Sequence, residues 1–478
     1  YPELGDNLSW KISNEPLYFK EHLCWTDITT KGLSFRYFPN GCIFDASVNV
    51  VFPKNVSSTS LLTFLNCKLV NTLAQLLNPT LHFKLVNYNS LPAMIAKVDL
   101  TDCIGQECVD LSRKDWNSFE TSWDFTTHPL VSMSKGLWDA TSTAAAMDYY
   151  YGYLPEASCP LEICYLLWQG QCNERFNKLK ANEEELNRIF IDIYGLQDEL
   201  TPEVEDKDVT VRKADLQRDI KSLLSYAVGC MFGRYSTYKD GLLFAGEPYS
   251  LQAFVDKMNE RPETISAEEL ERAYRNEGIV VDEMFFPDAD NVIPITDEEY
   301  LDDDIVSRLC AWLKAVYGAD TLEANLDYIA KALGNKGSTS REIIRNYFLN
   351  DFFKDHCQTY SVTGSGKRPI YWLFDSGKQN GFKALVYLHR YTPDTIGNLR
   401  IDYLHKMQRV YESEINRMQD MIDNSTNARE IAASTKRKEK LQKQLKECRN
   451  YDEMIAHLAL SRIELDLDDG VKVNYEKI

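Results

Sequence analysis

The chain has 478 residues, of which 44% are hydrophobic and 26% charged, a composition typical of a folded protein with several structural units. This excludes a single small module and an intrinsically disordered chain. The formal net charge of −19 excludes a surface that is basic all round, although a net value hides local segregation.

Neither a membrane span nor a secretory signal is visible. No run of about 18 uncharged apolar residues occurs, and the first residues lack a basic stretch followed by an apolar one. The twelve cysteines form no CxxC pair, and the histidines form no HxH or HExxH pair. We therefore expect reduced, buried cysteines, no metal site and a cytoplasmic location. Because the chain starts with Tyr1 and not Met, we also expect a fragment or a processed form with further chemistry upstream.

Residues 1–57 predict a small, irregular β-rich unit. Residues 34–38 alternate before the turn signal Pro39-Asn40-Gly41, and residues 48–52 are mostly β-branched or aromatic. Next, residues 57–60 supply N-cap side chains for an apolar helical stripe over 61–77 that stops at Asn78-Pro79. Residues 1–100 are therefore expected to form a β-rich domain with a closing helix.

From 101 to 340 the apolar periodicity is mostly helical, most clearly over 179–194 and 216–232. Residues 279–307 contain ten Asp or Glu and no Lys or Arg. This stretch predicts a solvated acidic connector that leads into a helix beginning near Asp304, where acidic side chains suit the positive helix N-terminus.

Residues 341–478 predict a C-terminal α/β element and a helical hairpin. A helical pattern covers 343–353, and two short buried strands, 369–374 and 384–388, flank a turn at 377–381. Beyond Leu404 the apolar spacing suits two antiparallel helices with coiled-coil-like packing. The predicted fold is thus α+β and mostly helical, with a β-rich unit, a helical scaffold, a small β-hairpin element and a C-terminal antiparallel helical hairpin.

Several enzyme signatures are incomplete. Gly364-Ser365-Gly366-Lys367 lacks the spacing and the following Ser or Thr of a phosphate-binding loop and predicts a flexible basic loop. Asn78-Pro79-Thr80-Leu81 lacks the second Pro and the aromatic residue with which amino-methyltransferases hold a flipped base, and it predicts a helix stop. No Gly-rich turn for a nucleotide cofactor occurs. No catalytic residue is therefore assigned.

Lysine and arginine concentrate in two segments. Residues 31–97 contain six Lys or Arg and one acid, and residues 331–450 contain 22 Lys or Arg and 13 acids. In the first segment the cations are interleaved with aromatic, amide and hydroxyl side chains. Protein surfaces that bind nucleic acid have this composition, because cations contact the phosphates and amide groups hydrogen-bond to base edges. On composition alone a mixed, solvated β surface is the commoner explanation, and this alternative stays open.

Several stretches carry a resemblance to a known family. Residues 61–70, 77–83 and 90–92 resemble the closing part of the target-recognition domain of adenine-specific DNA methyltransferases, as in type I and fused type II restriction-modification enzymes. Further stretches are similar to the C-terminal half of the PglX family, the adenine-specific DNA methyltransferases of BREX phage-defence systems: 116–125, 184–196, 219–226 and, most specifically, 367–376 with its continuation to 394. The resemblance runs from about Leu23 to at least Leu404.

This resemblance implies a function. The parent enzyme would transfer a methyl group from S-adenosylmethionine to N6 of an adenine in double-stranded DNA, for which the base must be flipped out of the stack. The family's catalytic half, with its cofactor loop and Asn-Pro-Pro-aromatic motif, has no counterpart here. The chain alone is therefore expected to be inactive and to bind no cofactor, and to be the DNA-recognition half of a site-specific N6-adenine methyltransferase.

Residues 1–100 would read base edges, and a second basic surface would lie within 367–409, where ordinary surface lysines on a structural core are an equally good explanation. The residues expected to bind DNA are Lys31, Arg36, Asn49, Lys54, Lys68, His82, Lys84, Lys367, Arg368 and Arg390. The expected partners are double-stranded DNA, the upstream catalytic half, and other defence-system proteins or phage inhibitors. The alternative function is a helical protein-interaction scaffold that docks such proteins through the acidic middle and the C-terminal hairpin.

Overall fold

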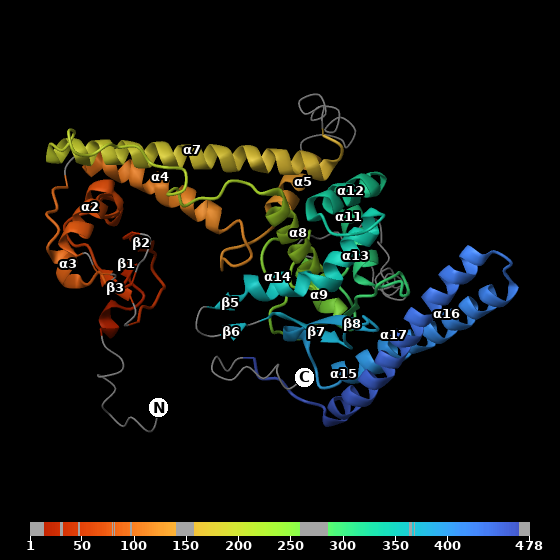
Figure 1. The fold of residues 1–478 in the computed structure, drawn as a ribbon. Coiled ribbons are helices and arrows are strands. Elements are labelled where there is room, and N and C mark those ends of the chain that lie inside the picture. Colours follow the sequence, from red (N-terminus) through yellow and green to blue (C-terminus); the bar gives the residue numbers. More distant parts are fainter. Residues whose placement is uncertain are drawn as a thin grey trace, which may run out of the picture. The chain divides into compact units, whose positions relative to one another are not determined.

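The computed structural model describes residues 14–28, 32–45, 48–78, 80, 82–95, 98–139, 157–258, 285–362, 366–367 and 369–467. The chain divides into two compact units (Figure 1). Unit 1 comprises Tyr1–Trp116 and Gly170–Lys213, and unit 2 comprises Asn117–Gln169 and Ala214–Ile478. Each unit is described by itself.

Unit 1 is built on a three-stranded antiparallel sheet of order β2 (Arg36–Phe38), β1 (His22–Thr26) and β3 (Val48–Val51). Because directly paired residues share a face, the register puts Leu23 and Trp25 on one side of β1 and Cys24 on the other. Leu23 and Trp25 are buried in the core that α1 (Ser58–Asn66) and α2 (Lys68–Leu77) complete. The β-rich character expected for this segment is confirmed.

The single helix predicted over 61–77 is in fact two helices. Ser57 caps α1 by accepting a hydrogen bond from the Ser60 N–H, and α2 ends before Asn78, as expected. The backbone is extended at Cys67, however, and the Asn187 side chain accepts a hydrogen bond from the Lys68 N–H at 2.7 Å. The apolar periodicity could not reveal this break, because the group that stabilises it lies over a hundred residues away.

The remaining elements of unit 1 enclose the same core. They are a 3₁₀ turn η2 (Glu15–Leu17), α3 (Leu85–Asn89), α4 (Val98–Trp116) and the part of α7 (Pro160–Tyr194) that follows residue 169. Phe190 of α7 is fully buried and packs edge-on against Phe64 of α1, with ring centroids 5.6 Å apart. Helix α4 lies against α1 at Gly105, where a Cβ would lie 2.5 Å from the Thr63 side chain. The core of residues 1–100 is therefore completed by residues 170–213.

Unit 2 is mainly helical around a second small sheet. Its helices besides the start of α7 are α5 (Pro129–Asp139), α8 (Leu216–Met231), α9 (Leu251–Met258), α11 (Ile305–Tyr317), η3 (Ala319–Thr321), α12 (Leu322–Leu333), α13 (Ser340–Asn350), α14 (Phe352–Thr359), η4 (Leu388–Arg390), α15 (Thr395–Asn398), the π-helix η5 (Leu399–Leu404), α16 (His405–Asn424) and α17 (Ala428–Ser461). Its strands are β4 (Val292–Pro294), β7 (Tyr371–Asp375) and β8 (Lys383–Tyr387), in the order β4-β8-β7, and the short pair β5 (Ser361–Val362) and β6 (Gly366–Lys367).

The acidic stretch is largely buried where the structure describes it, although Glu299 and Asp302 are exposed. Residues 291–296 are buried, and β4 pairs antiparallel with β8 inside the unit. Asp304, fully buried, caps α11 by accepting from the Val306 and Ser307 N–H groups, as its position before the helix predicted. The expectation of an exposed loop fails because other segments of unit 2 supply the counter-charges: Arg308 faces Asp288, and Arg345 faces Asp304. Residues 279–284 lie outside the described part.

The C-terminal prediction is confirmed. Helices α16 and α17 run side by side as an antiparallel pair (Figure 1), and Met407, Tyr411 and Met418 of α16 pack against α17 in a buried core. The β7–β8 hairpin also forms as expected, with Tyr371 opposite Tyr387. With two three-stranded sheets among many helices in the described residues, the mostly helical α+β class is confirmed.

A buried histidine in unit 2 makes stability depend on pH. His356 of α14 accepts hydrogen bonds at Nε2 from the N–H groups of Ile370 (2.9 Å) and Tyr371 (3.2 Å), and burial together with the Arg234 charge lowers its pKa to about 3. The unfolded chain takes up a proton at this histidine below about pH 6.5 and the native chain does not, so the free energy of unfolding falls as the pH drops.

Denaturant titrations at pH 7 and pH 5 check this prediction. In wild type the free energy of unfolding should decrease from pH 7 to pH 5. In His356→Gln, whose amide oxygen keeps an acceptor at the site, we expect this decrease to be smaller by about 2 kcal/mol. His457→Gln, on the exposed side of α17, is the matched control and should behave as wild type. If the free energy of unfolding decreases equally in wild type and His356→Gln between pH 7 and pH 5, the assignment of a neutral buried imidazole is contradicted.

Candidate nucleic-acid interface

The first group of predicted residues lies on the outer face of the unit 1 sheet. Arg36 of β2 pairs with Cys24 and so faces away from Trp25. On this face His22 stacks on Phe38 with ring centroids 5.3 Å apart, and Phe44 and Phe52 contact the same imidazole. Phe38 is 36% exposed, so the face offers an aromatic surface beside a cation.

Arg36 keeps its charge available on this face. The side chain is exposed, and it makes no ion pair with a residue that the structure describes. An acid does lie within electrostatic range: burial raises the pKa of Glu183 of α7 to about 7, with the Arg36 charge acting in the opposite direction. The guanidinium donates one hydrogen bond, from Nη1 to the Phe35 carbonyl at 3.3 Å, and its remaining donors can take an external anion.

Two further predicted residues flank β3 differently. Lys54 follows the strand and is exposed. Asn49 pairs with Trp25 and therefore shares the inner face, where it is half-buried. Lys54 thus suits a contact with a phosphate, whereas the Asn49 amide is directed to the side of the sheet opposite Arg36.

A second exposed cluster lies in residues 76–86, which we call the His82 segment. His82 Nδ1 lies 2.9 Å from a carboxylate oxygen of Asp27; the His82 side chain is exposed and that of Asp27 is half-buried. The side chain of Lys84 is exposed at the start of α3, where its backbone N–H donates to Asn87 Oδ1 at 3.0 Å. Four apolar side chains of this segment are exposed as well, namely Leu76, Leu77, Leu85 and Val86. Such a mixture suits contact with the sugars, bases and phosphates of a nucleic acid.

The His82 segment is fixed to the sheet by Trp25. The indole Nε1 donates to the Phe83 carbonyl at 2.7 Å, and the indole ring stacks on Tyr88 at 5.3 Å. Trp25 and Phe83 are both buried. The exposed cation of Lys84 is therefore carried on a rigid support, as a binding surface requires.

Two predicted DNA-binding residues have structural contacts instead. Lys68 Nζ donates to Thr201 Oγ1 and to the Glu203 carbonyl, both at 3.3 Å. Arg390 is 9% exposed, donates to the carbonyls of Phe232 and Ala289 at 3.0 Å, and lies over the Tyr249 ring at 3.5 Å. Arg390 is thus committed inside the protein and is not kept as a phosphate contact, whereas Lys68 lies at the surface with its ammonium group held by two hydrogen bonds.

Of the second basic surface expected within 367–409, Lys383, Arg390 and Arg400 are engaged inside unit 2, whereas Lys378, Lys406 and Arg409 are exposed. Lys383 is buried and donates to the Leu349 carbonyl at 3.0 Å, and Arg400 binds Asp452 through two hydrogen bonds. Lys31, Arg368 and the side chain of Lys367 lie outside the described residues. The exposed residues Arg36, Lys54, His82 and Lys84 of unit 1 make up the candidate interface.

Two features of the candidate interface are invisible in the sequence. Asp27, the partner of His82, lies 55 residues away from it. Leu76 and Leu77 continue the apolar stripe of α2, which predicts burial, yet they are 76% and 46% exposed. Their position in the last turn before Asn78 is the one local sign that they extend past the core.

The described residues do not fit an S-adenosylmethionine site. Every sheet among them is antiparallel, whereas a nucleotide-type cofactor is held where a parallel strand runs through a Gly-rich turn into a helix. The Asn78 side chain is committed locally, since its oxygen accepts from the Thr80 N–H and hydroxyl and its amide donates to the His82 carbonyl.

The described part of the chain offers neither a metal site nor a membrane span. No grouping of three or more His, Cys, Asp or Glu side chains suited to a metal ion occurs among the described residues. Nor does any helix there combine the length and apolar character needed to cross a bilayer. All twelve cysteines are described, and no disulfide joins any of them.

Over nearly its whole length the chain is similar to adenine-specific methyltransferases. It is 40% identical over 470 residues to the adenine-specific methyltransferase PglX of Lacticaseibacillus casei (strain Zhang), a match that covers 96% of this chain and 34% of the relative. It is 32% identical over 490 residues to the adenine-specific methyltransferase BrxX of Escherichia coli O9:H4 (strain HS), covering 98% of this chain and 36% of the relative. The chain thus spans about a third of the length of these relatives, and no family model matches it. The resemblance to PglX expected from the sequence is confirmed.

Proposed function

We propose that this chain is the DNA-recognition part of a site-specific N6-adenine DNA methyltransferase that acts in BREX-type phage defence. The observation that carries the proposal is the 40% identity to an adenine-specific methyltransferase over 96% of the chain. A methyltransferase that modifies a base inside a duplex needs a part that holds the DNA while the base is flipped out. We assign that role to this chain, with double-stranded DNA and a catalytic methyltransferase part as its partners.

The contacts of unit 1 support this role. Arg36, Lys54 and Lys84 present exposed cations that would position the phosphates of a duplex. Arg36 and His82 also carry donors that suit base edges, and a good bidentate contact contributes roughly 1–3 kcal/mol of discrimination between bases. S-adenosylmethionine would be bound outside the described residues, and the chain alone would not transfer a methyl group.

Binding of a mixed-sequence duplex, followed by fluorescence anisotropy at several salt concentrations, tests the proposal. We expect wild-type affinity to fall steeply with salt, because bound phosphates release counterions. The double variant Arg36→Gln/Lys84→Gln should bind more weakly. It should also lower the slope of log K against log salt by roughly 0.9 for each phosphate that the variant no longer neutralises.

The matched control is Lys331→Gln/Lys336→Gln, which removes two exposed cations from unit 2 and changes the net charge equally. It should leave the slope close to that of wild type. If the unit 1 substitutions leave the slope of log K against log salt unchanged, the assignment of the binding surface to unit 1 is wrong. If wild type does not bind the duplex at any salt concentration, the proposed function is wrong.

The second candidate function is a helical scaffold that docks other defence proteins or phage inhibitors. The exposed apolar side chains of the C-terminal hairpin favour it, with Met454 60% and Leu460 81% exposed. The acidic middle gives it less support, since residues 285–296 are mostly buried and only Glu299 and Asp302 are exposed acids among residues 285–304. A scaffold of this kind would bind little DNA even at low salt, so the same titration separates the two functions.

A further inference from the structure

Helix α17 carries a concentration of positive charge that the proposed recognition surface does not use. Between residues 428 and 449 it contains eight Lys or Arg and three Asp or Glu. The chain as a whole has the opposite balance, with a net charge of −19. A local excess of cations on one long helix is the pattern expected where an anionic partner binds.

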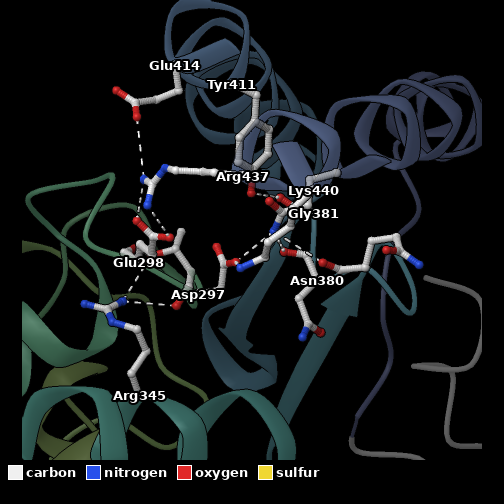
Figure 2. A network of polar contacts seen from close by, with 12 residues as sticks. Asp297, Glu298, Arg345, Asn380, Gly381, Tyr411, Glu414, Arg437 and Lys440 are labelled. Atoms are coloured by element: carbon white, nitrogen blue, oxygen red, sulfur yellow. Dashed lines mark hydrogen bonds and ion pairs between the residues drawn. The ribbon is translucent and has the colours of Figure 1, made fainter. Parts of the chain in front are cut away.

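One part of this charge fixes α17 to the body of unit 2 (Figure 2). Arg437 makes two hydrogen bonds with the Glu298 carboxylate, at 2.7 and 3.1 Å. Lys440 pairs with Asp297 at 2.5 Å, and Gln444 donates to the same carboxylate at 2.9 Å. The acids of residues 297–298 are therefore engaged by the middle of α17 and hold that helix in place.

A second set of cations has no such role. Arg429, Lys436 and Lys443 are all exposed, and none forms an ion pair or a side-chain hydrogen bond with a described residue. They are spaced by seven residues, which on an α-helix is nearly two full turns and about 10 Å, so the three side chains follow one face. We call them the α17 cation row. Glu439 is an exposed acid beside it.

The row suits a polyanion with regularly spaced charges. Each side chain of the row is long and flexible, and none pairs with a carboxylate of a described residue. Its charged group can therefore reach an external anion from several directions. Duplex DNA supplies phosphates all along both strands, and several cations in line bind such a backbone without reading sequence. An acidic protein would bind the row only if its carboxylates had the same spacing as the three cations. A DNA duplex meets this requirement without any special arrangement.

We propose that the α17 cation row is a second, sequence-independent contact with the DNA backbone, separate from the recognition surface of unit 1. This inference rests on the proposed function, because it requires that the chain binds duplex DNA. It predicts that removing the row weakens binding to every sequence to the same extent.

The test compares three charge variants in the anisotropy titration with the full chain. Arg429→Gln/Lys436→Gln/Lys443→Gln should raise the Kd and lower the salt slope by up to roughly 2.7, the value for three phosphate contacts. Glu439→Lys should lower the Kd at low salt. Lys331→Gln/Lys336→Gln/Lys354→Gln, three exposed lysines elsewhere in unit 2, is the control for net charge and should have little effect. Gln and Lys are good helix formers, and circular dichroism checks that α17 is intact.

The outcomes separate this inference from the proposed function. If the row variant matches wild type while Arg36→Gln/Lys84→Gln binds weakly, the recognition role stands and the row is overturned as a DNA contact. If the row variant alone loses affinity, the row is supported and the unit 1 surface is overturned. A wild-type chain that binds no duplex at any salt overturns both.

Discussion

Replacing Arg345 by methionine is expected to lower the free energy of unfolding of unit 2 by about 3–5 kcal/mol, the usual cost of stranding a buried charge. Arg345 is 8% exposed, and it pairs with Asp304, whose side chain is completely buried. The guanidinium also donates to the carbonyl and hydroxyl oxygens of Thr296, both at 3.1 Å. Methionine fills similar space but leaves the Asp304 carboxylate without its counter-charge. Urea titration gives the change in midpoint and slope.

Two variants show whether the buried charge causes the loss. Arg341→Gln removes an exposed ion pair with Glu323 from the same helix and should cost no more than about 1 kcal/mol. The double variant Arg345→Met/Asp304→Ser should recover much of the stability, because serine still caps α11 and no unpaired charge remains. If the double variant is as unstable as Arg345→Met, lost packing and not the stranded carboxylate explains the effect.

Truncating Trp25 to alanine should destabilise unit 1 by about 3–5 kcal/mol, the range for large aromatic side chains in a core. Trp25 is 1% exposed, contacts the rings of Phe35 and Tyr88, and donates to the Phe83 carbonyl. Its loss leaves a cavity under the sheet and frees the His82 segment. We therefore expect DNA affinity to fall together with stability, as measured by thermal unfolding and by anisotropy.

The control for Trp25 is Trp123, which is fully exposed. Trp123→Ala should change the free energy of unfolding by no more than about 0.5 kcal/mol. Trp25→Phe keeps an aromatic ring in the core but removes the hydrogen bond to the Phe83 carbonyl and one ring of the indole, so an intermediate cost of about 1–3 kcal/mol is expected. An affinity that survives Trp25→Ala would show that the His82 segment does not depend on this support.

Local signals in the sequence predicted the elements whose stabilising groups are also local. Ser57 and Asp304 mark helix starts because an N-cap acts on the next three residues. The α16–α17 hairpin follows from apolar spacing within each helix. The break at Cys67 was missed because Asn187, far along the chain, satisfies the freed backbone group.

The sequence predicted the candidate site only in part, again because the partners of some residues lie far away along the chain. The number of Lys and Arg residues identifies a basic segment, but it does not show which of these side chains form contacts inside the folded protein. Arg36 and Lys84 stay exposed, whereas Arg390 is buried against Tyr249 and two backbone carbonyls. Likewise, the acids of 285–304 predicted exposure because their partners Arg308 and Arg345 come from helices whose packing the sequence does not display.

If unit 1 reads DNA as proposed, the division of the chain has a consequence for how specificity can be exchanged between related proteins. Unit 1 is assembled from two separate stretches, Tyr1–Trp116 and Gly170–Lys213, with part of unit 2 encoded between them. Phe190 of the second stretch is fully buried against the first. A single crossover that transplanted residues 1–100 alone would leave the core of the donor without its own α7 residues. New specificity would therefore be acquired by replacing individual exposed side chains on a retained framework, or by two coordinated exchanges, and not by moving one cassette.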